Sequence, residues 1–304
     1  MKNALSVFAA FVLLLRSAAA STFVVSQDLS FGTLVPISSS GSVVVGINSA
    51  ITTNGSVSVA PSGTAYYAGL GVFTGSGLSV VADVLTITIL SSSVNLSNGS
   101  GGVVVVNNFT ATPNSSISLL SPSTNVYVGG TMNFTSASTP GNYTGSVQVQ
   151  GSGLLSGTVV MTLPIILTLW NPLGISQTAA LSFGGLEILG GNSVVQIAPQ
   201  TGARTIVSGT GGVNLISGNP GNAGVFQITG NPNTSVTITL PSTASLTGPG
   251  TAMSVSNFTG YPSSTAATLG ASGTLTLDVG AQLNVNAAQA AGTYSGTYTL
   301  TASY

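Results

Sequence analysis

Residues able to perform acid, base or nucleophilic chemistry are few in this 304-residue chain. It contains no histidine and no cysteine, and only 2% of its residues are charged. Without these two residue types there is no Ser-His-Asp triad, no Cys-His pair and none of the usual zinc ligand sets. The hydrolytic scheme that remains is a glycosidase with two carboxylates about 5 to 9.5 Å apart.

The four acidic residues are too scattered to favour that scheme. Asp28 precedes a Leu-Ser-Phe-Gly phrase, and Glu187 follows a second one. Asp83 and Asp278 lie far from both, and no loop groups several carboxylates as calcium sites do. We therefore expect solvated surface or turn carboxylates, no metal, no cofactor and no enzymatic activity.

The first 20 residues have the pattern of a secretory signal peptide. Lys2 supplies a positive start, residues 4–15 form an apolar run, and three alanines at 18–20 offer a cleavage site before Ser21. The run is shorter than the roughly 20 residues that span a bilayer, so we expect no retained transmembrane helix. The expected location is extracellular or at a cell surface.

Removal of this segment leaves Arg204 as the only basic residue against four acidic ones. Nucleic-acid binding depends on neutralising phosphates, so nucleic acid is excluded as a partner. An exported chain without cysteine also has no disulfide framework. Packing of β-sheets must therefore stabilise the fold alone.

One pattern occurs twice, about 150 residues apart. Residues 29–32 match 181–184, 71–73 match 224–226, 108–110 match 257–259, 128–130 match 279–281, and 141–145 match 292–296. Five pairs of matching segments that follow the same order indicate two tandem domains of one fold. We place the signal peptide at 1–20, the first domain at 21–157 and the second at 158–304.

The local pattern predicts strands throughout both domains. Short runs rich in Val, Ile, Thr and Tyr, bounded by turn residues, occur at 42–47, 84–90, 102–106, 147–149, 194–197, 235–240, 274–279 and 298–304. No helical pattern of comparable strength follows the signal peptide. The predicted class is all-β, with two tandem antiparallel β-sandwich domains of immunoglobulin-like topology.

The most apolar stretch after the signal peptide is 158–170, which contains Pro164. It is too short for a membrane helix, and the proline would interrupt one. We expect a strand that ends the first copy or opens the second. Trp170, the sole tryptophan, is expected to pack at the domain junction, with a ligand platform as the alternative.

These phrases resemble the bacterial secreted family called domain of unknown function 4402. The second copy is similar over residues 180–304, including the closing Gly-Thr-Tyr-Ser-Gly-Thr-Tyr run, and the first copy is a looser match. The resemblance implies a surface or fimbria-like β-sandwich protein. It brings no catalytic residues to carry over.

Sheet edges need protection, which monomeric proteins usually obtain from Lys, inward-facing charges or Pro. This chain has few charges for that purpose, so we expect neighbouring subunits to cover its edges by strand addition. Candidate assembly strands are the N-terminal segment 21–27, with Phe23 and Val25, and the closing strand, with Tyr298, Leu300, Ala302 and Tyr304. The alternative for both is an internal strand of their own domain.

The sequence therefore predicts a secreted structural protein of the bacterial surface, as a subunit of a fimbria-like or other extracellular assembly. Expected partners are copies of itself or other surface subunits, with an export chaperone as a further candidate. A monomeric surface adhesin or binding module is the alternative. A lesser alternative is an outer-membrane β-barrel, because the closing strand ends in an aromatic residue.

Overall fold

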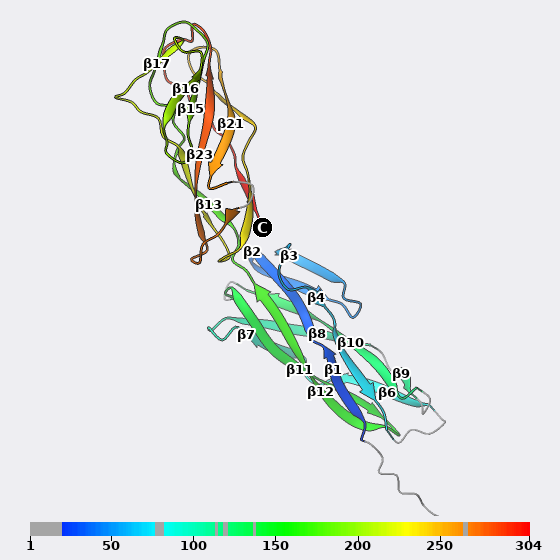
Figure 1. Ribbon diagram of the computed structural model, residues 1–304. Helices are drawn as coiled ribbons and strands as arrows, with labels where there is room; N and C mark the ends of the chain where they lie inside the picture. The colour runs from blue at the N-terminus through cyan, green and yellow to red at the C-terminus, as the bar shows by residue number, and fades with distance from the viewer. Residues whose placement is uncertain (1–19, 77–81, 113–114, 118–120, 136–137, 264–266) are drawn as a thin grey trace, which may run out of the picture. The chain divides into compact units, whose positions relative to one another are not determined.

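The computed structural model describes residues 20–76, 82–112, 115–117, 121–135, 138–263 and 267–304, and residues 1–19 of the predicted signal peptide lie outside them. The described residues form β-strands and no helix (Figure 1). The described residues therefore include no helix that could span a bilayer. The chain divides into two compact units, Met1–Gly32 with Ser38–Ser56 and Thr64–Thr168, and Thr33–Ile37 with Val57–Gly63 and Leu169–Tyr304.

The first copy of the repeat contains twelve strands. They are β1 (Thr22–Gln27), β2 (Leu29–Val45), β3 (Ile51–Val59), β4 (Tyr66–Tyr67), β5 (Gly69–Thr74), β6 (Asp83–Ile89), β7 (Ser93–Ser97), β8 (Val103–Ala111), β9 (Ser115–Ile117), β10 (Ser123–Phe134), β11 (Gly141–Gly153) and β12 (Gly157–Leu169). Hydrogen bonds join them in the order β1-β5-β10-β8-β7-β11-β12-β2-β3, with β4 on β2, β6 on β11 and β9 on β6. The end of β2 also pairs with β10.

These strands form two layers around one core. Met161 of β12 lies directly over Gly71 of β5, and Phe73 of β5 lies over Gly151 of β11. The layer that contains β5 therefore faces the layer that contains β11 and β12. Alternate residues of β12 are buried in this core, as expected for a strand with one inward face.

The second copy contains twelve further strands. They are β13 (Gly174–Ala179), β14 (Leu186–Ile188), β15 (Ser193–Ile197), β16 (Arg204–Ser208), β17 (Val213–Leu215), β18 (Gly224–Thr229), β19 (Ser235–Thr239), β20 (Thr243–Leu246), β21 (Met253–Tyr261), β22 (Ala267–Thr268), β23 (Thr274–Val285) and β24 (Thr301–Ser303). The large sheet has the order β13-β18-β23-β15-β16, with β21 on β23 and β20 on β21. Two small sheets, β14-β17 and β22-β19-β24, complete the copy.

The small sheets pack against the large one through two apolar clusters. Val213 of β17 belongs to a cluster with Val195 and Leu283 of the large sheet. Ile238 of β19 belongs to a second cluster with Phe226 and Leu277. Both copies are therefore layered antiparallel sheets, and the predicted class of two tandem β-sandwich domains is confirmed.

Two repeated landmarks are explained by the backbone. Asn108 and Asn257 have φ values of 47° and 51°, and the strand pairing with β10 or β23 shifts register beside each of them. Asparagine tolerates this left-handed conformation better than most residues. A side chain at Gly129 or Gly280 would strike a backbone carbonyl oxygen of the neighbouring strand. The repeat therefore preserves positions where the geometry restricts the residue type.

Each of the eight runs predicted as strands overlaps an observed strand. The last run, 298–304, overlaps only the short strand β24. The apolar stretch at 158–170 is β12, and it pairs with β11 of the first copy. The first unit runs to Thr168, and the predicted domain bounds of 21–157 and 158–304 stay predictions.

Candidate functional site

The strand pairs of the two copies correspond closely, with one difference. The pairs β1–β5, β5–β10, β8–β10, β7–β8, β6–β9 and β6–β11 recur as β13–β18, β18–β23, β21–β23, β20–β21, β19–β22 and β19–β24. Thr144 pairs with Ser97, and the matching residues Ser295 and Thr247 form an isolated bridge. In the first copy, β12 lies between β11 and β2. The described residues of the second copy provide no strand at that position.

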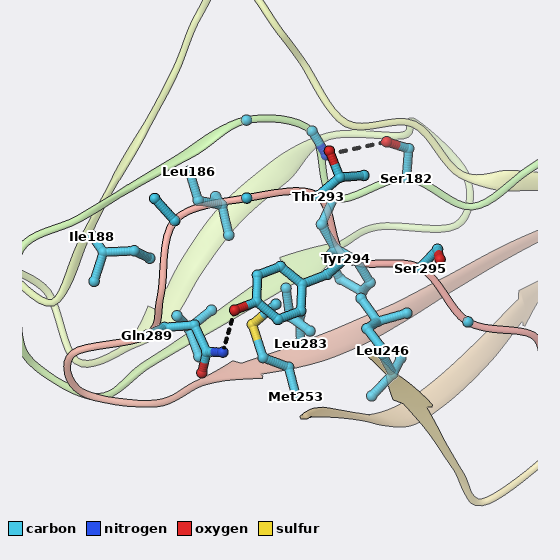
Figure 2. A pocket seen from close by; sticks show the side chains of 18 of the residues that line it. Ser182, Leu186, Ile188, Leu246, Met253, Leu283, Gln289, Thr293, Tyr294 and Ser295 are labelled. Atoms are coloured by element: carbon cyan, nitrogen blue, oxygen red, sulfur yellow. Dashed lines mark hydrogen bonds between the residues drawn. The ribbon is translucent and has the colours of Figure 1, made fainter. Parts of the chain in front are cut away.

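A cavity of about 1210 Å³, which we call the slot, lies at this position of the second copy (Figure 2). Residues 180–190 form one wall, and they correspond in the repeat to the beginning of β2. Residues 288–298 form the other wall, and part of it corresponds to the beginning of β11. The floor is apolar and comes from the large sheet, with Leu246, Met253, Val255, Leu283 and Val285. Figure 2 shows Tyr294 above Met253 and Leu283, across from Leu186 and Ile188.

Burial shows what the open slot changes. In the first copy the side chains of Leu29, Leu96 and Tyr143 are 0% exposed. Their counterparts Leu181, Leu246 and Tyr294 line the slot and are only partly buried. These side chains are thus more exposed to solvent in the second copy, whose described residues include no strand equivalent to β12.

The 288–298 wall is held by side-chain hydrogen bonds around Tyr294. The Tyr294 hydroxyl donates to the carbonyl oxygen of Ala290 at 2.9 Å and accepts from the Gln289 amide at 2.8 Å and from the Gly250 N–H at 3.0 Å. The Gln289 amide also donates to the Thr251 carbonyl oxygen at 2.6 Å. This wall is therefore fixed in place although it is not a regular strand.

Arg204 fixes the other wall. Its guanidinium donates to the carbonyl oxygens of Phe183 at 2.8 Å, Gly185 at 2.9 Å, Asn219 at 3.2 Å and Ile216 at 2.7 Å. Phe183 and Gly185 belong to the wall, and the planar guanidinium can satisfy several carbonyls at once. Sequence reasoning counted Arg204 only as a charge, and no local motif indicated this role.

Tyr298 belongs to the lining of the slot, but its hydroxyl points into the core, over Gly224 of β18. Its ring packs against Phe258 at 5.0 Å and Phe226 at 6.0 Å between centroids. The hydroxyl oxygen is buried and has no hydrogen-bond partner among the described residues. Burial raises the pKa of Tyr298 to about 12. The matching residue of the first copy is Val147, which is fully buried.

Asp83 holds the turn that leads into β12 of the first copy. The backbone amides of Leu154, Leu155 and Ser156 donate to its carboxylate at 2.9 to 3.1 Å, and the Ser156 hydroxyl donates at 2.8 Å. Burial by itself would raise the pKa of Asp83, but these hydrogen bonds outweigh it and lower the pKa below 3.8. Asp83 is thus a turn carboxylate, one of the two kinds expected, but it is buried at 4% exposure and not solvated.

The other acidic residues take part in no comparable cluster. The Glu187 carboxylate accepts a hydrogen bond from the Asn214 amide at 2.9 Å, and Asp278 lies in β23 opposite Val225. Among the described residues, no three acidic residues come together as a metal site would require. The absence of a metal and a cofactor stays an expectation.

The N-terminal candidate assembly strand, β1, lies in the sheet of its own copy. Phe23 pairs with Phe73 of β5, with ring centroids 5.6 Å apart, and Val25 pairs with Gly71. β1 stands at one end of the hydrogen-bonded order, so it is an edge strand. Its exchange between subunits stays a prediction.

The closing candidate strand also lies within its own copy. Its core β24 pairs with β19, and the four predicted residues pack on one apolar cluster, namely Tyr298, Leu300, Ala302 and Tyr304. The ring of Trp170 packs edge-on against Tyr304 at 5.3 Å, within the second unit. A role for Trp170 at the domain junction stays a prediction.

No curated protein matches this chain. One similar solved structure is the CsuC-CsuE chaperone-tip adhesion subunit pre-assembly complex from archaic chaperone-usher Csu pili of Acinetobacter baumannii, with 12% identity over 76% of this chain and 89% of that chain. Its TM-score of 0.28 is too low to support an argument on fold or function.

A family model supplies the clear result. The model described as "domain of unknown function (DUF4402)" matches residues 22–151 and, separately, residues 173–304. These two regions coincide with the two copies of the repeat and leave β12 between them. The chain therefore belongs to the DUF4402 family, of which it carries two copies in tandem.

Proposed function

We propose that this chain is a secreted structural protein of the bacterial surface, which joins a fimbria-like or other extracellular assembly by β-strand addition. The observation that carries the proposal is the slot, an apolar opening at the position where the first copy holds β12. A sandwich whose described residues leave this position open, beside one that fills it, supports a chain that receives a strand from a neighbour.

Low charge supports the same proposal. Only 2% of the residues are charged, and the edge strands β13 and β16 have Arg204 as their one charged side chain. The Arg204 guanidinium is itself engaged with four carbonyl oxygens. Edges without charges or prolines are open to pairing with other chains.

The gain from such pairing is large enough. The inward face of β12 buries five apolar side chains, namely Met161, Leu163, Ile165, Leu167 and Leu169. At about 1.5 to 3 kcal/mol for each side chain, a comparable strand would gain about 7 to 15 kcal/mol. Association costs about 4 to 15 kcal/mol, and backbone hydrogen bonds add to the gain. A long-lived complex is therefore feasible.

The proposal includes no catalytic step. The Asp83 carboxylate and the Arg204 guanidinium, two of the few charged groups, are engaged in hydrogen bonds that hold turns and walls. An export chaperone is a further proposed partner, because an exposed apolar slot invites aggregation before assembly.

The experiment uses the bacterium that makes the chain. Material sheared from its surface is separated by size and imaged by negative-stain microscopy with gold-labelled antibodies to the chain. We expect the chain in extracellular multimers that survive high salt and dissociate on heating, because apolar burial is not screened by salt. Recovery as a free monomer would contradict the proposal and favour the monomeric adhesin or binding module.

A further inference from the structure

The first copy shows which chemistry fits the slot. The inward side chains of β12 are large and apolar at every second position from Met161 to Leu169, and each is at most 2% exposed. The outward positions carry residues such as Thr162 and Pro164, and β12 has no charged residue. An extended segment with five alternating apolar side chains is therefore the occupant that this fold accepts between its two walls.

The slot presents matching surfaces to such a segment. Leu181, Leu246 and Tyr294 occupy the positions of Leu29, Leu96 and Tyr143, which are fully covered in the first copy. The floor adds further apolar side chains, including Met253 and Leu283 (Figure 2). The long, apolar shape of the lining, with one wall at 180–190 and the other at 288–298, suits an extended polypeptide.

The backbone of the 288–298 wall is also largely without β-pairing among the described residues. Its counterpart in the first copy, β11, is a regular strand of 13 residues with β12 beside it. In the wall itself, among the described residues, only Ser295 forms a β-bridge, and that bridge is to Thr247.

The described strands of a second copy of this chain are poor candidates. β12 is buried in its own core, and β1 is only six residues long and already pairs with β5. We infer that the slot receives an extended, uncharged strand of a different protein chain, with large apolar side chains at alternate positions, which lies between residues 180–190 and 288–298 as β12 lies between β2 and β11. This inference rests on the proposed function, and it names the site and the partner's chemistry.

A self-completed variant tests the inference. Because Tyr304 matches Gly153 at the end of β11, the full chain is extended after Tyr304 with a second copy of residues 154–169. The added segment should turn back and fill the slot as β12 does in the first copy. We expect the unfolding midpoint of the second unit to rise by about 5 °C or more. Amide exchange at 181–189 and 292–298 should slow by about tenfold or more.

The matched control carries the same extension with serine at its five inward positions. It should leave the midpoint and the exchange rates as they are in the unextended chain. Equal behaviour of the apolar and serine extensions would overturn the inference. To guard against misfolding of the extension, residues 157–169 are also fused to a carrier protein and titrated against the full chain. We expect saturable binding by this fusion and no binding by its serine version. Equal binding by both fusions would likewise overturn the inference.

The outcomes separate the inference from the proposed function. If the apolar extension stabilises the second unit but the natural chain never enters surface multimers, the inferred chemistry of the slot's occupant stands and the assembly role fails. If multimers form normally from the self-completed variant, assembly does not use the slot and the inference fails. If the multimers contain only this chain, the partner is a second copy and the inference of a different protein is wrong.

Discussion

The first copy closes its core with β12, whereas the second copy leaves the matching position open over an apolar floor. The two copies otherwise share their strand pairs, their bulges at Asn108 and Asn257 and their tyrosines at 143 and 294. Tyr143 and Tyr294 even donate to equivalent carbonyl oxygens, of Thr139 and Ala290. One strand, and not the family fold itself, therefore distinguishes the described residues of the two copies.

The largest effect is expected from substitutions that weaken the packing of β12 in the first copy. Leu163 and Ile165 are fully buried, so replacement of either by alanine should lower the free energy of unfolding of the first unit by about 2 to 5 kcal/mol. Denaturant unfolding followed by hydrogen exchange would locate the loss. The control is Leu154→Ala in the preceding turn, where the side chain is 94% exposed, and its effect should stay within about 0.5 kcal/mol. Equal losses from both variants would contradict a sealing role for β12.

A smaller effect is expected from Asp83→Asn, which weakens the turn between β11 and β12. The carboxylate accepts charge-assisted hydrogen bonds from three amides and one hydroxyl, so the loss should be about 2 to 3 kcal/mol at pH 7. Because folding lowers the pKa of Asp83 from 3.8, this stabilisation is complete above about pH 4 and disappears as the pH falls through the folded value.

Denaturation at pH 7 and near pH 2.5 checks the sign of this effect. The natural chain and the Asp83→Asn variant should differ at the higher pH, and the difference should shrink at the lower one. Asp278→Asn, at a partly exposed carboxylate, serves as the control and should change stability by less than about 0.5 kcal/mol. A difference at Asp83 that does not depend on pH would exclude the ionised carboxylate as its source.

The smallest effect concerns the open copy. Arg204→Met removes the donor to four carbonyl oxygens and should cost about 1 to 2 kcal/mol, with faster amide exchange at 181–189. Lysine should not restore the exchange protection, because a single ammonium cannot hold the same fork of acceptors. Full protection in Arg204→Lys would show that charge alone holds this wall.

Much of the fold follows from local sequence patterns. Alternating β-branched residues indicated the strands, and the repeated phrases indicated two copies, because those signals depend on neighbours in the chain. Even the 158–170 stretch was identified as a strand, since its length and Pro164 disfavoured a helix. Its place between β11 and β2 was not predicted, because β2 lies more than 100 residues earlier and no local pattern encodes that pairing.

The candidate site was not predicted, for a related physical reason. The slot is formed by two walls about 100 residues apart, and it exists because the second copy's described residues lack a strand that the first copy has. Asp83 was misjudged because its partners are 71 to 73 residues away in the chain. One sequence signal was available, namely that the apolar 158–170 stretch lies outside the repeated landmarks and has no second occurrence.

The short turn of Leu154, Leu155 and Ser156 has a further consequence for how completion depends on dilution. A strand tethered by three residues experiences an effective local concentration of millimolar order or higher, whatever the protein concentration. The first copy therefore closes equally well in a dilute periphery and in a crowded compartment. A strand supplied from elsewhere obeys mass action instead, so its occupancy follows the local abundance of its supplier.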